Sequence, residues 1–434
     1  MAERERLLLR VAVRLSTRRG SPLTEILRRN GMALGKRLSR VFVRIVTIIC
    51  GTVLLGCGTD DASDEGLRTI KIGAIFDLTG ATSDVGVDYA DGVRGYVDWV
   101  NAQGGIAGHT IDLFYQDYAY QIDRAEQLYS QFVQEGAVVF MGWGTGDTEA
   151  LRLRITEDQI PFSSASLSHV LGDAVESPYN FLVATTYSDQ FKIVLRWISE
   201  DYQARGGTGA PQVALMHNAS PFGMSPWVYG GEAYAAEIGV VVTRYEMSRG
   251  ATDFTAEFTR IRQAGAEYVV FQNTSAPVSV AIRSARSLGI DATFVCLNWC
   301  ANALLMRLVG EDAEGLVGAM PYAPLTADVP GVQPLRDYLE ERGESYTERT
   351  NAYTQGWYTF RIFAEGLRRV IDAGQDLTGH NIKIALESIR DLDMEGVTIP
   401  ITFTATDHRG SKGLRLFQVE NGTWTPLTDF LTAP

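Results

Sequence analysis

The sequence predicts an α/β protein of two lobes, each built on a doubly wound parallel sheet. Short apolar runs typical of buried strands alternate with helical patterns, which favours parallel sheets with helices on both faces. The part after residue 56, about 378 residues, is also too long for one ordinary hydrophobic core. Two stretches of similar pattern, 69–187 and 188–321, fit a duplicated arrangement.

The strand predictions rest on apolar runs that end in polar loops. We expect strands over 70–76, 138–141, 213–216, 268–271 and 293–295. Helical spacing of apolar residues predicts helices over 88–101, 122–135, 189–204, 226–238, 252–264, 277–288 and 350–373. The loops after the strands are rich in Thr, Ser, Gly and Asn, and open α/β sheets bind small ligands at these strand ends.

The amino-terminal residues predict an export signal. An apolar run of 12 residues, 45–56, follows a basic stretch and ends at Cys57. A membrane-spanning helix needs about 20 apolar residues, so this run suits the core of a signal peptide better. Residues 1–56 would then be the signal peptide, with Met32 as an alternative start, and 58–68 would form a flexible tether.

The end of that signal resembles the bacterial lipobox, in which the cysteine is acylated. The sequence from Leu54 to Cys57 reads LLGC. This resemblance implies a lipid anchor on Cys57 and an exported protein, on the outer face of the cytoplasmic membrane or in the periplasm. Gly58 leaves sorting to an outer membrane open. A short buried helix that ends in cysteine is the alternative.

The charge of the chain excludes two classes of partner. Residues 1–56 hold 12 basic and 3 acidic side chains, and the remainder holds 27 and 49. Such an acidic surface repels nucleic-acid phosphates and anionic lipids. We therefore expect no nucleic-acid partner, and membrane contact only through the lipid anchor.

Several motifs resemble those of the type I periplasmic binding proteins that serve branched-chain amino acid ABC transporters. They are LTG at 78–80, NAQGGIAG at 101–108, GATDF at 250–254, ARSLG at 285–289 and GLVG at 315–318. The resemblance covers nearly all of 69–434. It implies two doubly wound lobes joined by a three-crossover hinge, the Venus-flytrap arrangement.

The same resemblance implies lobe boundaries and a function. Lobe one would comprise 69–187 and 323–391, and lobe two 188–322 and 392–434. The protein would be a solute-binding protein without enzyme activity. It would close its hinge around a small polar organic ligand, such as an amino acid, an amide or urea-like solute or a small carboxylate, and deliver it to an ABC permease.

Candidate ligand contacts in lobe one follow from the matching loops. Thr145 lies in a glycine-rich loop and matches a family residue that holds the ligand carboxylate. Ala165 and Ser166 match a segment that holds the ligand amino and carboxylate groups. Trp143 offers a stacking face, and Thr79 is a further candidate contact. Turn formation and helix capping are the alternative roles for such residues.

Candidate contacts in lobe two depart from the family pattern. Phe222 stands where the family often has tyrosine, so it offers a ring without a hydroxyl, and Gln272, Asn273 and Thr274 follow a predicted strand. Asn298 stands where amino-acid-binding members carry a carboxylate. A buried ammonium without a countercharge is costly. We therefore expect an amide, a urea-like solute or a small carboxylate in preference to an amino acid.

The cysteines and histidines of the sequence give no indication of an enzyme reaction. Cys296 and Cys300 are expected to form a short-loop disulfide, with two free thiols as the alternative. The five histidines are scattered, and no metal spacing or nucleophile motif accompanies them. We expect no metal, no cofactor and no catalytic residue. A sensor lipoprotein, a secreted α/β hydrolase and a lipoprotein that binds nothing are the alternative functions.

Overall fold

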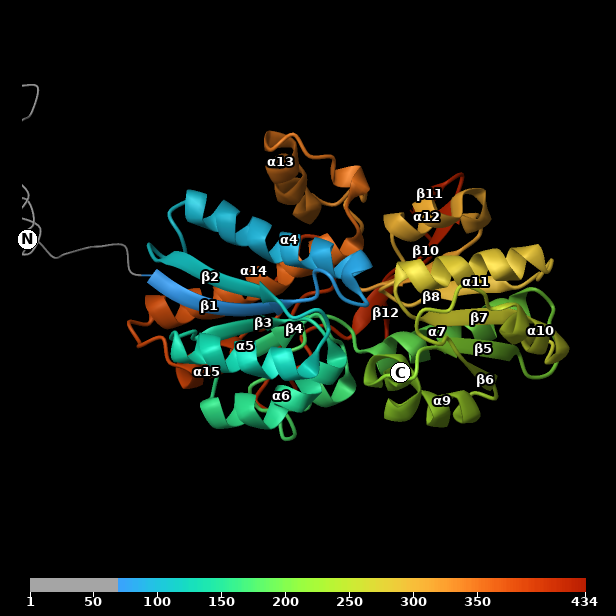
Figure 1. Cartoon of the computed structure of the whole chain (residues 1–434), viewed down its shortest axis with the longest axis horizontal. Coiled ribbons are helices and arrows are strands. Elements are labelled where there is room, and N and C mark those ends of the chain that lie inside the picture. The colour runs from blue at the N-terminus through green and yellow to red at the C-terminus, as the bar shows by residue number, and fades with distance from the viewer. Residues whose placement is uncertain (1–68) are drawn as a thin grey trace, which may run out of the picture. The chain divides into compact units, whose positions relative to one another are not determined.

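Two sheets organise residues 69–434, the part of the chain that the computed structural model describes (Figure 1). The expected signal peptide, lipidated Cys57 and tether 58–68 lie outside the described residues. Within 69–434, none of the helices combines the length and hydrophobicity needed to span a bilayer. The predicted α/β class with two parallel sheets is confirmed.

The first sheet has four parallel strands in the order β2-β1-β3-β4. Its elements are β1 (Thr69–Phe76), α4 (Ser83–Ala102), β2 (Thr110–Asp117), α5 (Ile122–Gln134), β3 (Val139–Gly142), α6 (Thr145–Asp158) and β4 (Phe162–Ser164). Because β1 lies between β2 and β3, the chain passes from β1 to β2 on one side of β1 and then crosses to β3 on the other side. This reversal opens a crevice at the carboxyl ends of β1 and β3.

The second sheet repeats this order with five parallel strands and adds antiparallel strands, giving β11-β10-β9-β8-β7-β5-β6, with β12 on β10. Its elements are β5 (Gln212–His217), α8 (Pro221–Pro226), α9 (Glu232–Glu237), β6 (Val241–Glu246), α10 (Thr255–Gln263), β7 (Tyr268–Gln272), α11 (Ser275–Ser287), β8 (Thr293–Cys296), α12 (Ala303–Val309), β9 (Val317–Met320), β10 (Gly413–Glu420), β11 (Thr423–Pro426) and β12 (Leu431–Thr432). A second crevice therefore lies at the ends of β5 and β7.

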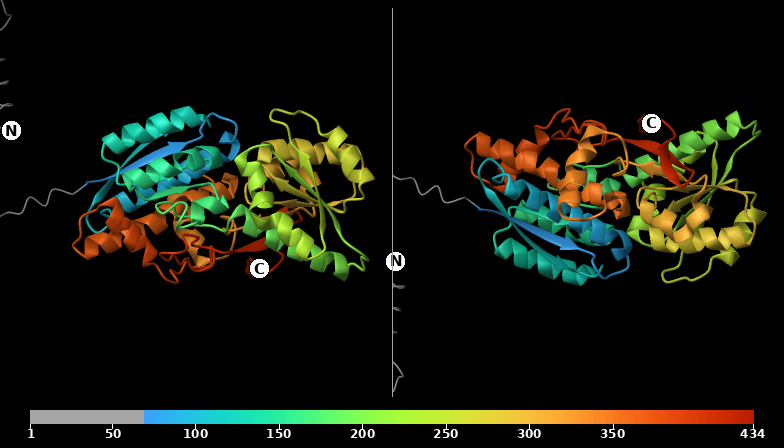
Figure 2. Two further views of the ribbon diagram at one scale, coloured as in Figure 1. Left: turned by 90° about the horizontal axis from the view of Figure 1, so that it is seen from below. Right: turned by 90° about the horizontal axis from the view of Figure 1, so that it is seen from above.

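The segments that connect the two lobes lie side by side. The Tyr322 hydroxyl donates to the Val183 carbonyl at 3.2 Å, and the Thr185 hydroxyl donates to the Gly413 carbonyl. These bonds tie together three segments that are far apart in the sequence. From there α7 (Tyr187–Ala204) enters lobe two, whereas α13 (Gln333–Glu341), α14 (Asn351–Asp372) and α15 (Gly379–Glu387) return to lobe one (Figure 2).

The last crossing lies later in the sequence than expected. Met394, Ile401 and Phe403 are buried in the core of lobe one, and Leu182 forms a β-bridge with Arg409. Lobe two therefore resumes at β10, and not at residue 392. The segment before β10 has no long strand or helix, so it gives no periodic signal for its lobe.

Each lobe has its own core. The first core joins both faces of sheet one to α4, α5 and α14. The second sheet is covered on both faces: Phe258 and Ile282 lie in one cluster, and Phe191 and Ile198 in the other. Helices on both faces explain why strands such as β7 are buried along their whole length.

Two glycines allow α4 and α14 to approach closely. A Cβ at Gly356 would lie 2.1 Å from the Tyr89 carbonyl oxygen, and one at Gly92 would lie 2.1 Å from the Tyr353 carbonyl oxygen. Both contacts are with backbone atoms, which cannot rotate away. The helix pair that covers sheet one therefore depends on glycine at these positions.

We predict that Gly356→Ala lowers the free energy of unfolding by about 1–3 kcal/mol, because the added methyl group forces the helices apart. Urea denaturation followed by circular dichroism measures this change. Gly146→Ala is the matched control, since it adds the same methyl to α6 with no atom nearer than 3.6 Å. Equal stability of the two variants would contradict the close-packing argument.

Candidate functional site

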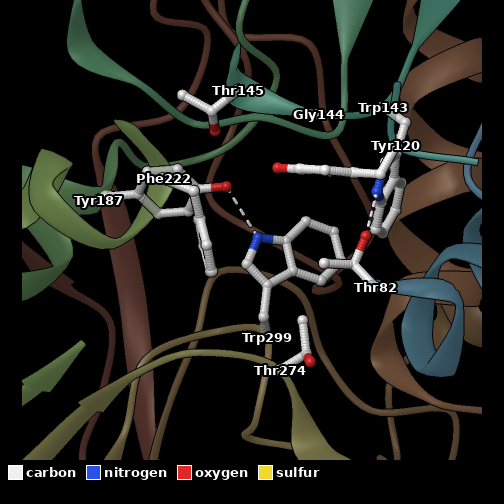
Figure 3. A pocket seen from close by; sticks show the side chains of 9 residues that line it. All are labelled: Thr82, Tyr120, Trp143, Gly144, Thr145, Tyr187, Phe222, Thr274 and Trp299. Atoms are coloured by element: carbon white, nitrogen blue, oxygen red, sulfur yellow. Dashed lines mark hydrogen bonds between the residues drawn. The ribbon is translucent and has the colours of Figure 1, made fainter. Parts of the chain in front are cut away.

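A small cavity of about 20 Å³ lies where strand ends of the two sheets meet (Figure 3). It is lined by Thr82, Tyr120, Trp143, Gly144, Thr145, Tyr187, Phe222, Thr274 and Trp299. Most of these residues follow the carboxyl end of a strand, as the two crevices require. Five are aromatic and three are threonines. No charged side chain lines this inner cavity.

A buried carboxylate shapes the loop after β1. Asp77 accepts hydrogen bonds from the Gly80 N–H at 2.6 Å, the Thr82 N–H at 2.9 Å and the Thr82 hydroxyl at 2.7 Å. The Thr82 hydroxyl in turn accepts from the Trp143 indole at 2.8 Å. Asp77 is therefore a turn former, as its type and position predict. It fixes one wall of the cavity without lining it.

The loop after β2 supplies Tyr120 through an unusual backbone conformation. Ala119 and Tyr120 have φ angles of 52° and 56°. This region costs a residue other than glycine about 1–3 kcal/mol. Asp117 supports the turn by accepting from the Leu78 and Ala119 N–H groups at 3.0 and 2.9 Å. The strained turn places the Tyr120 ring at the cavity (Figure 3).

The helix α6 begins at the cavity wall. Thr145 is its first residue, and the Thr145 and Ser166 hydroxyl oxygens lie 2.7 Å apart. One of these hydroxyls donates to the other, so the pair is held in place. The amino-terminal end of a helix favours an anionic group such as a ligand carboxylate.

A second buried carboxylate lies beneath the start of α6. Asp147 accepts from the Tyr118 hydroxyl at 2.9 Å and from the Gly144 N–H at 3.3 Å. Burial raises the pKa of Asp147 to about 6, although both hydrogen bonds oppose the shift. This carboxyl group supports the loop that carries Gly144 and Thr145.

Lobe two contributes aromatic rings to the same cavity. The Trp299 indole donates to the Tyr187 hydroxyl at 2.8 Å, and its ring centroid lies 5.0 Å from that of Trp143. The Phe222 ring meets Tyr187 edge-on at 5.3 Å. Burial raises the pKa of Tyr187 to about 12, so its hydroxyl stays protonated. These rings form a rigid apolar surface with a few hydroxyl groups (Figure 3).

A hydrogen bond joins the two lobes beside the cavity. Asp84 of α4 accepts from the Ala276 N–H in the first turn of α11 at 2.8 Å. Burial raises the pKa of Asp84. Next to it, the Thr274 hydroxyl oxygen is buried and has no hydrogen-bond partner among residues 69–434. The Thr274 hydroxyl lowers the pKa of the neighbouring Asp84 carboxyl and so opposes the effect of burial.

An outer cavity of about 570 Å³ continues from the inner one. Thr82, Tyr120 and Phe222 line both. The outer cavity also holds charged side chains, Glu246 at the end of β6 and Arg249 just beyond it. An exposed carboxylate therefore lines the outer cavity, at a strand end where the sequence analysis did not place one.

The structure brings several predicted residues together. Trp143, Thr145, Phe222 and Thr274 line the inner cavity. Asn273 lines the outer one. Their roles in ligand binding stay predictions.

Three other predicted residues support the site from behind. Ser166 bonds Thr145, and Ala165 is fully buried and accepts from Gln355 at 3.2 Å. The Gln272 amide donates to the Phe222 carbonyl at 3.0 Å and so holds the lobe-two loop. None of these three lines either cavity.

Two predicted contacts lie elsewhere. Thr79 is exposed, and its hydroxyl donates to Asp117, because the turn around Asp77 directs Thr82 to the cavity instead. Asn298 lines a separate small void, and its N–H donates to the Gln190 side chain at 3.2 Å. The next residue, Trp299, occupies the cavity wall in its place.

The expected disulfide is wrong. Cys296 and Cys300 are free thiols buried in the core of lobe two. The Cys300 thiol faces the Leu297 carbonyl at 3.6 Å, while burial and the neighbouring Cys300 raise the pKa of Cys296 well above its usual value. Both behave as small apolar core residues. Residues 69–434 also contain no group of three His, Cys, Asp or Glu side chains placed to hold a metal ion.

The cleft residues that the sequence analysis did not predict include Thr82, Tyr120, Tyr187 and Glu246. Thr82 lies in the loop after β1, and Glu246 is the last residue of β6. Both strands point into the cleft, so a position at a strand end was a usable signal for a cleft residue. Tyr187 begins α7 just after a crossing segment, and nothing in its local sequence indicates that location.

The raised pKa of Asp147 predicts a pH effect on stability. The folded-state pKa of about 6 exceeds the model-compound value of 3.8. Folding therefore takes up a proton between these values, and the wild type loses stability as pH rises from 4 to 6. Relative to Asp147→Asn, which does not titrate, we expect a loss of about 1–3 kcal/mol between pH 4 and pH 7. Urea unfolding of both proteins measures it, and a pH-independent difference would contradict it.

Known proteins share this architecture. Residues 69–423 match the family model for periplasmic binding proteins. The Leu/Ile/Val-binding protein of Escherichia coli (strain K12) is 23% identical over 316 residues, 70% of this chain and 82% of the relative. The leucine-, isoleucine-, valine-, threonine-, and alanine-binding protein of Pseudomonas aeruginosa is 22% identical over 298 residues, 66% of this chain and 73% of the relative.

Solved structures agree. A branched chain amino acid ABC transporter protein from Thermus thermophilus with bound valine superposes with a TM-score of 0.79 at 27% identity, covering 85% of this chain and 97% of its own. An ABC transporter substrate-binding protein from Aeropyrum pernix gives 0.75 at 27% identity, with 85% and 96% covered. Three of these four relatives are named as binding proteins, and the fourth is an ABC transporter protein with bound valine. The chain therefore belongs to the periplasmic binding protein family.

Proposed function

We propose that this protein is the solute receptor of an ABC importer and that it binds a small branched-chain amino acid such as valine. The observation that carries the proposal is the composite cleft. An uncharged cavity of aromatic rings and threonines opens into an outer cavity that holds Glu246. A small aliphatic amino acid has both matching parts, an apolar body and a charged end.

The inner cavity has a volume of about 20 Å³, room for about one water molecule, so a ligand side chain enters it only when the surrounding loops open. The side chain of valine or leucine would pack against Trp143, Phe222 and Trp299. The start of α6 at Thr145 favours the carboxylate. Glu246 offers the ammonium a countercharge.

Asn298 gives no reason to exclude an amino acid ligand, because it lies outside both cleft cavities, in a separate void. Glu246 lies at the cleft instead. The Thermus thermophilus relative, which contains bound valine, supports the same ligand class.

The family places the protein outside the cytoplasm. We further propose that Cys57 is lipidated, that 58–68 tethers the lobes to the membrane, and that the closed form delivers its ligand to a permease. The three adjacent crossings support hinge closure, because they concentrate the lobe connections in one place.

Isothermal titration calorimetry with four ligands tests the proposal. Valine carries both charges, valinamide lacks the carboxylate, isovalerate lacks the ammonium, and isovaleramide is uncharged. We expect valine to bind most tightly. Glu246→Gln should weaken valine binding by about 10- to 100-fold, because a hydrogen bond to a charged group contributes about 1.5–3 kcal/mol.

Two controls make the result specific. Glu237→Gln removes an equivalent exposed charge on α9, away from the cleft, and should leave valine binding unchanged. Isovalerate has no ammonium, so Glu246→Gln should not weaken its binding. Equal affinity of the wild type for isovaleramide and valine would overturn the assignment of an amino acid ligand.

A further inference from the structure

A separate cavity of about 280 Å³ lies near the lobe connections. One wall is the segment 323–329, which packs with lobe one. The other wall belongs to lobe two and carries Arg415 on β10, Trp424 on β11 and Phe430. No residue that lines the inner or outer cleft cavity lines this one.

Two side chains that line the cavity carry buried hydrogen-bond donors that lack acceptors. The Arg415 Nε and the Trp424 Nε1 are buried, and neither has a partner among residues 69–434. Within the same residues Arg415 forms no ion pair, although its guanidinium lies 4.6 Å from the Phe430 ring centroid. A buried donor without an acceptor costs about 1–3 kcal/mol, so such groups need an explanation.

The surrounding side chains indicate what would satisfy these donors. Met320, Phe417 and Phe430 give the cavity apolar walls. Asp328 is the one carboxylate among the lining residues, and its side chain is exposed. An arginine that stacks on an aromatic ring and has no carboxylate partner is suited to a planar anion.

We propose that this cavity binds a small carboxylic acid with an apolar body. The carboxylate would accept from the Arg415 guanidinium, and the apolar body would pack against the Met320, Phe417 and Phe430 side chains. The volume of about 280 Å³ lies just below the usual range for ligand sites, about 300–1,000 Å³. A strongly hydrated phosphate fits these apolar walls less well. The occupant would contact both lobes beside their connections.

Calorimetric titration of the purified protein with benzoate tests the proposal. We expect saturable binding, weakened at least about tenfold by Arg415→Gln, since loss of a charge-assisted hydrogen bond corresponds to that change. Arg307→Gln is the matched control, because Arg307 is an exposed arginine of α12 without an ion pair among the described residues. Retained valine binding by Arg415→Gln shows that the variant is folded.

A second variant separates this cavity from the cleft. Thr145→Val alters the cleft and should leave benzoate affinity unchanged. Benzoate binding that Thr145→Val abolishes and Arg415→Gln leaves intact would overturn the proposal. So would binding of phosphate but not of benzoate. If benzoate does not bind saturably up to about 10 mM, the cavity holds only water and the proposal is wrong.

Discussion

The Trp299 indole is the contact on which the shape of the cleft depends. The loop after β8 in lobe two carries it, yet its side chain is only 5% exposed and packs within the core cluster of lobe one. Its N–H group bonds Tyr187, and its ring lies against Trp143. Together with the bond from Ala276 to Asp84, it joins loops of both lobes around one cavity. The cavity has this shape only while the lobes stay together.

The fold could be predicted because buried parallel strands are apolar along their whole length. Runs such as 268–271 are recognisable without any alignment, and they give the α/β alternation directly. The last crossing could not be located in this way. Residues 392–410 form bridges and turns, and Phe403 is buried by contacts with residues far away in the sequence. Local periodicity carries no information on such contacts.

The site was predictable at the level of loops but not of single side chains. Strand ends indicated the loops that carry Trp143, Thr145, Phe222 and Thr274, and these residues do line the cavity. Within a loop, hydrogen bonds decide which residue faces the ligand. Asp77 turns Thr82 inward, for example, and leaves Thr79 exposed. These bonds depend on tertiary structure.

Closure of the lobes around the ligand is most directly tested by double electron–electron resonance between spin labels on the two lobes. Val87→Cys in α4 and Ser287→Cys in α11 introduce exposed labelling sites, whereas Cys296 and Cys300 are buried. The composite cleft predicts that saturating valine shortens the distance between the labels and narrows its distribution. Identical distributions with and without bound valine would contradict closure around the ligand.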